Sequence, residues 1–193
     1  MGETSRHKFG ARAWVALVLC CLVGPQVLAQ GLWREDEQRL NVGIKLFPAS
    51  LGADLALAQR LDDQGKLRIL VVHDGDEVHA GQVVKGLAEV SQVGQYPIRV
   101  LAVALDDLGR FADQPVAALF VASPGIPQVV FREWAYRQKT LVFSPFAGDV
   151  ERGAAAGVFV SDRILPYVNP RWAQKAGIEF KPFFLRIARL YED

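Results

Sequence analysis

Apolar and polar residues follow one another along this chain in blocks that predict strands and helices in turn. Four apolar runs have the length and composition of buried strands: residues 67–73, 98–104, 116–122 and 141–143. Between the first two runs and between the last two, residues 78–90 and 127–138 show helical spacing. This alternation requires crossover connections. It predicts an α/β protein with a Rossmann-like, mainly parallel sheet flanked by helices.

Residues 31–61 read as mostly helical, because Leu32, Leu40, Ile44 and Phe47 recur at helical spacings and residues 53–61 are rich in Ala and Leu. Pro48 lacks an amide donor and disfavours helix at Phe47, so we expect it to break or kink this run. The segment 45–48 is then either a turn between two helices or the end of a strand.

The alternation of predicted strands and helices ends after Gly148. Residues 157–161 and 164–168 predict an antiparallel hairpin at the edge of the sheet. Asn169 is predicted to cap a short helix that ends at Gly177. A C-terminal amphipathic helix is predicted from Pro182. Its apolar face would hold Phe183, Phe184, Ile187, Ala188 and Tyr191, with Arg186, Arg189 and Glu192 opposite.

The first 29 residues have the pattern of a secretory signal peptide. Arg6, Lys8 and Arg12 precede an apolar run over residues 13–23, and a small-residue stop ends at Ala29. The run is short of the roughly 20 residues that a membrane-spanning helix needs, although a retained N-terminal anchor is the alternative. We therefore expect cleavage after Ala29, a periplasmic location and a single domain over residues 30–193.

Charge and cysteine content argue against nucleic-acid binding and against cysteine-based chemistry in that domain. Residues 30–193 carry 19 Lys and Arg and 20 Asp and Glu, which gives no basic footprint for nucleic acid. Both cysteines, Cys20 and Cys21, lie in the predicted signal peptide. The mature chain therefore has no disulfide and no cysteine-based site.

Two polar clusters follow predicted strands, where open α/β sheets bind ligands. The first is the HDGDEVH segment from His73 to His79. It is either a metal or ligand site, or a solvated turn that caps the next helix. The second joins Ser144 and Asp149 with Ser123 from the preceding strand. It could hold a small anion or a carbonyl group, or could simply shape the loops.

No recognised catalytic motif occurs in the chain, so we predict no catalytic residue, cofactor or metal, and no enzyme. A hydrolase that uses Ser144 with His73 as its base is a distant alternative. The C-terminal helix either docks on the chain's own sheet or meets a partner protein. The candidate partner-binding residues are Phe183, Phe184, Arg186 and Arg189.

The stretch from Thr140 to the end resembles the YfiR-like family of periplasmic regulators. The shared pattern is a Gly-x-x-x-Gly segment from Gly153, an edge hairpin that ends in Asn169, and a helix that closes at residues 176–178. The sequence FFLRIAR at residues 183–189 is similar to the family's closing helix. The resemblance is weaker over residues 67–125.

The resemblance implies a Rossmann-like periplasmic domain, often a homodimer. Family members are similar to a repressor that binds the periplasmic part of a membrane-bound diguanylate cyclase, and we expect this chain to bind the sensor domain of such a cyclase or of a histidine kinase. Binding of this kind holds down cyclic-di-GMP synthesis and biofilm formation. Disulfides tune the best-known members, and this chain departs from them because its mature part has no cysteine. The alternative function is a periplasmic small-solute-binding protein that uses the loops at His73, Ser123, Ser144 and Asp149.

Overall fold

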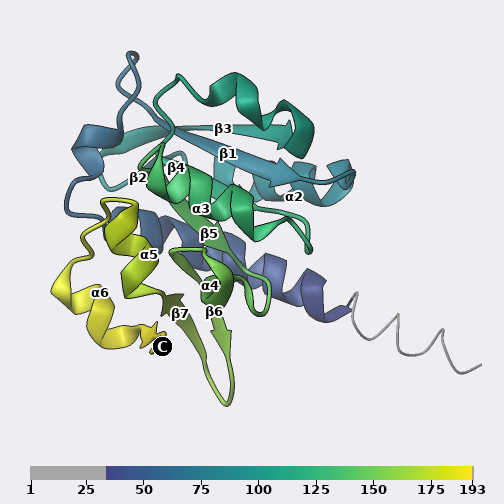
Figure 1. The fold of residues 1–193 in the computed structure, drawn as a ribbon, viewed down its shortest axis with the longest axis vertical. Helices are drawn as coiled ribbons and strands as arrows, with labels where there is room; N and C mark the ends of the chain where they lie inside the picture. The colour runs from purple at the N-terminus through teal and green to yellow at the C-terminus, as the bar shows by residue number, and fades with distance from the viewer. Residues whose placement is uncertain (1–33, 193) are drawn as a thin grey trace, which may run out of the picture. The chain divides into compact units, whose positions relative to one another are not determined.

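The computed structural model describes residues 34–192, and its centre is an eight-stranded sheet of order β2-β3-β1-β4-β5-β6-β7-β8 (Figure 1). The predicted signal peptide, with its cleavage after Ala29, lies outside the described residues. Residues Gln38–Asp193 form one compact unit, and the other unit, Met1–Glu37, is described only over residues 34–37. Within the described part of the chain, no helix is both long and apolar enough to span a membrane.

The central strands β3, β1, β4, β5 and β6 are mutually parallel, and β7 returns antiparallel to β6. The predicted Rossmann-like α/β fold with an antiparallel hairpin is therefore confirmed. The strands are β1 Leu67–His73, β2 Gln92–Val93, β3 Tyr96–Ala104, β4 Ala118–Val121, β5 Leu141–Ser144, β6 Ala156–Val160, β7 Ile164–Val168 and β8 Arg189–Leu190. The helices are residues 34–52, α2 Glu77–Ala88, α3 Gln128–Tyr136, α4 Asp149–Arg152, α5 Pro170–Lys175 and α6 Pro182–Ile187, with 3-10 turns η1 Leu57–Arg60 and η2 Leu105–Phe111.

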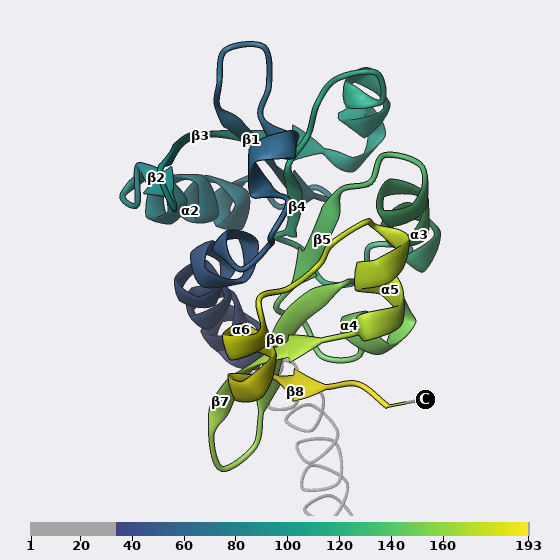
Figure 2. The same ribbon diagram turned by 90° about the vertical axis from the view of Figure 1, so that its left-hand side faces the viewer.

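The helices divide between the two faces of the sheet. Figure 2 shows α2, α6 and residues 38–52 of the first helix on one side, with α3, α4 and α5 on the other. The ring of Phe47 meets the rings of Phe120 and Phe143 edge-on, each at a centroid distance of 5.4 Å. All three side chains are fully buried, so this aromatic cluster holds residues 38–52 of the first helix on the first face.

Pro48 was predicted to break or kink the N-terminal helix, and the predicted break is wrong, because residues 34–52 form one helix. Pro48 lies about one turn before the end of this helix, so it removes a single late hydrogen bond. Burial of Phe47 and Leu51, both with no exposed surface, outweighs that loss. The segment 45–48 is therefore neither a turn nor a strand end.

The C-terminal helix was predicted to run past residue 187, and this part of the prediction is also wrong. After Ile187 the chain becomes extended, with Ala188 at ψ 149°. Residues Arg189 and Leu190 then pair in parallel with β7 as β8, and the Tyr191 amide donates to the Val168 carbonyl at 2.8 Å. The open edge of β7 satisfies these backbone groups better than another helical turn would.

The predicted start and stop signals around α5 are confirmed. The side chain of Asn169 accepts a hydrogen bond from the Trp172 amide at 3.2 Å and caps the helix. Gly177 ends the helical segment with φ +65°, a conformation that glycine adopts without strain.

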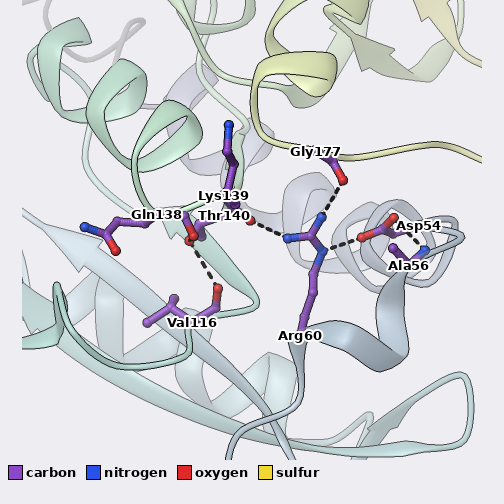
Figure 3. A network of polar contacts seen from close by, with 8 residues as sticks. All are labelled: Asp54, Ala56, Arg60, Val116, Gln138, Lys139, Thr140 and Gly177. Atoms are coloured by element: carbon purple, nitrogen blue, oxygen red, sulfur yellow. Dashed lines mark hydrogen bonds and ion pairs between the residues drawn. The ribbon is translucent and has the colours of Figure 1, made fainter.

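One arginine joins three segments that are far apart in sequence. Arg60, at the end of η1, donates hydrogen bonds to the Asp54 carboxylate and to the carbonyl oxygens of Lys139 and Gly177 (Figure 3). The side chain of Asp54 has no exposed surface, and that of Arg60 is 10% exposed. Nearby, the Thr140 hydroxyl donates to the Val116 carbonyl at 3.1 Å. This junction ties η1 to the segments that follow α3 and α5.

Candidate functional site

The predicted ligand residues lie at the carboxyl ends of three neighbouring strands. His73 is the last residue of β1, Ser144 is the last residue of β5, and Ser123 lies two residues beyond β4. After β1 the chain adds β3 on one side of β1, and it then adds β4 on the other side. The order of strands therefore reverses between β1 and β4. In open α/β sheets such a reversal is the usual place for a ligand.

His73 is buried at this reversal point, with 6% of its surface exposed. Its Nδ1 has no hydrogen-bond partner among the described residues. Beside it, the Asp74 amide donates to the Ser123 hydroxyl oxygen at 3.2 Å and links the ends of β1 and β4. The structure thus brings His73 and Ser123 to adjacent strand ends.

The rest of the HDGDEVH segment has a structural role. Asp76 caps α2, since its carboxylate accepts from the His79 amide at 3.1 Å and lies 2.6 Å from the His79 Nδ1. Partial burial acts to raise the pKa of Asp76, but the hydrogen bonds from His79 outweigh it and hold that pKa below its ordinary value. Among residues 34–192, no group of three or more His, Cys, Asp and Glu side chains is arranged to hold a metal ion.

Ser144, at the end of β5, and Asp149, at the start of α4, are joined by a side-chain hydrogen bond. The Ser144 hydroxyl donates to the Asp149 carboxylate at 2.5 Å and accepts from the Phe146 amide at 3.3 Å. Arg152 pairs with the other oxygen of the same carboxylate. Both Ser144 and Asp149 are fully buried, and burial raises the pKa of the Asp149 carboxyl despite these two partners.

The strand register separates Ser144 from His73. Val72, Val121 and Ser144 are level across β1, β4 and β5, so Ser144 is two strands away from β1, or roughly 10 Å at ordinary strand spacing. His73 follows Val72, and successive side chains point to opposite faces of a sheet. The hypothesis that His73 activates Ser144 as a nucleophile is therefore wrong.

The four candidate partner-binding residues divide between surface and core. Phe183 is 54% exposed and Arg186 is exposed, as contact with a partner requires. Phe184 is only 1% exposed and its ring lies 5.2 Å from that of Phe180, so its prediction as a partner contact is corrected to a core residue. Arg189 belongs to β8, where its guanidinium lies 5.8 Å from the centroid of the Phe159 ring.

Three further exposed apolar residues lie on α6 and on the neighbouring hairpin, and none of them was among the predicted partner contacts. Ile187 is 56% exposed on α6, and Val160 and Ile164, paired at the end of the β6–β7 hairpin, are 43% and 52% exposed. The chain leads from Ile187 into β8, which pairs with β7 of the hairpin. We call Val160, Ile164, Phe183 and Ile187 the α6–hairpin surface. The signal that could have found it is the run of apolar residues beside the polar turn at residues 161–163.

Comparison with known proteins supplies little further information. No protein-family model and no curated protein matches this chain. Among solved structures, the ABC domain in complex with L-Trp from Streptococcus pneumonia is similar, with 14% sequence identity and a TM-score of 0.47. The alignment covers 72% of this chain and 61% of that one, so less than two thirds of that protein is matched. A similarity of this degree carries no argument about what this chain binds.

Proposed function

We propose that this chain is a periplasmic regulatory protein that binds the sensor domain of a membrane-bound diguanylate cyclase or histidine kinase and lowers its output. The observation that carries the proposal is the α6–hairpin surface. Large apolar side chains that are exposed on neighbouring elements can mark an interaction site, and α6 lies beside β7 of the hairpin. The resemblance of the stretch from Thr140 onward to YfiR-like regulators supports the choice of a membrane sensor as the partner.

The division between Phe183 and Phe184 makes the proposal specific. Large aromatic side chains that become buried on binding contribute much of the energy of protein interfaces. Phe183 and Ile187 are one helical turn apart on α6, so both can enter the same partner surface. Phe184 between them packs into the domain and keeps the helix in place.

A photo-cross-linking experiment in living cells tests this proposal. The photoreactive residue p-benzoylphenylalanine would replace Phe183 in the full-length protein, and a matched variant would carry it at Val78, which is 81% exposed on α2. We expect position 183, but not position 78, to form an adduct with a membrane protein that has a periplasmic sensor domain. Equal adducts at both positions, or adducts only with abundant envelope proteins, would contradict the proposal.

A small ligand at the reversal point of the strand order is the second candidate function. The buried, unpartnered Nδ1 of His73 beside the Asp74–Ser123 hydrogen bond favours it. Thermal melting of the mature protein with a panel of amino acids and small carboxylates tests it. A rise in melting temperature that is lost in His73→Phe but kept in His79→Gln would support binding there. Absence of any rise across the panel would count against it.

A further inference from the structure

Cations and aromatic rings of α3, α4, α5 and the segment after α3 form a strip. Figure 2 shows these three helices on the face of the sheet opposite α6. Each member contacts the next. The Arg132 Nε donates to the Arg152 carbonyl at 3.3 Å, and the Arg132 guanidinium lies 5.5 Å from the centroid of the Trp172 ring. On the same ring system, the Lys175 ammonium lies 4.0 Å from the centroid. The Lys139 ammonium donates to the Lys175 carbonyl at 2.9 Å and lies 4.9 Å from the Tyr136 ring centroid.

In the part of the chain that the structure describes, three of the four cations in this strip keep an unpaired positive charge, whereas the charge of Arg152 is paired with that of Asp149. Glu133 of α3 pairs with Arg137, and Asp149 pairs with Arg152. Within residues 34–192, neither Arg132, Lys139 nor Lys175 forms an ion pair with an acidic side chain. The wider region has the same sign, because residues 128–192 contain ten Lys and Arg against six Asp and Glu.

The aromatic rings hold these cations in place before any partner arrives. A cation over a ring face is attracted to it, and this attraction restricts an otherwise flexible side chain. Restricting side chains in advance lowers the entropy lost on binding. Trp172 is half-buried and has cations near its ring, so it is poorly placed to insert into a lipid layer. Because the cations follow one another along the strip, they can pair with successive carboxylates of an extended acidic segment.

We infer that the strip formed by Arg152, Arg132, Trp172, Lys175, Lys139 and Tyr136 binds an acidic segment of a partner protein. This inference goes beyond the proposed function and does not depend on the α6–hairpin surface. It concerns other helices, the opposite face of the sheet and a different chemistry. Each proposal can therefore fail without the other.

The test measures binding of a fluorescein-labelled oligoglutamate peptide to the mature protein by fluorescence anisotropy. Residues 30–193 have one more acidic than basic side chain, so the chain as a whole does not attract a polyanion. We expect binding at low salt that weakens as salt is added, because exposed charges are screened. Lys139→Glu with Lys175→Glu should weaken it roughly tenfold, since two attractions become two repulsions.

A matched control has the same change in net charge elsewhere on the surface. Arg99 and Arg110 are exposed on β3 and η2, and Arg99→Glu with Arg110→Glu should leave the affinity within roughly threefold of wild type. Circular dichroism would confirm that both double variants are folded. No binding by the wild-type protein, or equal losses in the two double variants, would overturn the inference. Binding to phosphatidylglycerol vesicles but not to oligoglutamate would overturn it as well.

Discussion

Replacing Arg60 with alanine should destabilise this domain strongly, although the side chain is partly exposed. The substitution removes the three hydrogen bonds that join η1 to the carbonyl oxygens of Lys139 and Gly177 and to the Asp54 carboxylate. The two carbonyls can turn to water, but the Asp54 side chain has no exposed surface. Breaking a buried ion pair and leaving one charge behind typically costs about 3–5 kcal/mol. We therefore expect Arg60→Ala to lower the free energy of unfolding by about 3–5 kcal/mol.

Urea unfolding of residues 30–193, followed by tryptophan fluorescence, measures this effect. Arg60→Lys should recover only part of the loss, because a lysine cannot reach three acceptors in the planar geometry of a guanidinium. The double variant Arg60→Ala with Asp54→Asn should be more stable than Arg60→Ala alone, since it no longer buries an unpaired charge. A loss below about 1 kcal/mol in Arg60→Ala, or a double variant no better than the single one, would refute the reasoning about a stranded charge.

Three further changes test the packing and the electrostatics of the domain. Gly43→Ala would place a Cβ 2.8 Å from the Pro145 Cβ and should cost about 1–3 kcal/mol in urea unfolding, whereas Gly81→Ala, with open space around it on α2, should stabilise by up to about 1 kcal/mol. Phe184→Ala should cost about 3–5 kcal/mol, whereas Phe183→Ala should stay within about 0.5 kcal/mol of wild type; similar losses in the two would mean that both side chains are core. Asp62 accepts hydrogen bonds from the amides of residues 66 and 64, which outweigh desolvation and hold its pKa below the ordinary value of 3.8. The ionised Asp62 therefore contributes fully to the free energy of unfolding above pH 3.8, and this contribution is lost as the pH falls through the lowered pKa. In Asp62→Asn, the free energy of unfolding should fall less steeply with decreasing pH below 3.8 than in wild type. An equally steep fall in the variant would contradict this.

The parallel sheet could be predicted because its strands are buried on both faces and therefore read as continuous apolar runs. Pro48 is an example in which local sequence preferences did not predict the structure. The sequence identifies a residue that disfavours helix, but the cost depends on where it falls, and Pro48 falls near the helix end with Phe47 buried beside it. A local rule was overruled by tertiary packing that no local pattern reveals.

The candidate sites could be predicted in part for the same reason. Strand-end positions follow from the α/β pattern, so His73, Ser123 and Ser144 could be placed at one edge of the sheet. Whether a polar side chain there is free or bonded depends on neighbours, and Ser144 is already bonded to Asp149. The face of α6 was harder to predict. Its short length and the extended chain after Ile187 leave Phe183 outside and Phe184 inside, which helical periodicity over a longer helix does not predict.

The pairing of residues 53–56 with residues 179–181 has a consequence for how this domain folds. Asp54 bridges Phe180, the Leu55 amide donates to the Glu179 carbonyl at 2.8 Å, and the Lys181 ammonium donates to the Gly52 carbonyl at 2.8 Å. Contacts between segments so far apart in sequence carry a large loop-closure entropy and slow the folding reaction. The end of the first helix cannot form these hydrogen bonds until residues 179–181 have been synthesised. A nascent chain that stops before residue 179 would leave that helix end unpaired and exposed to proteases.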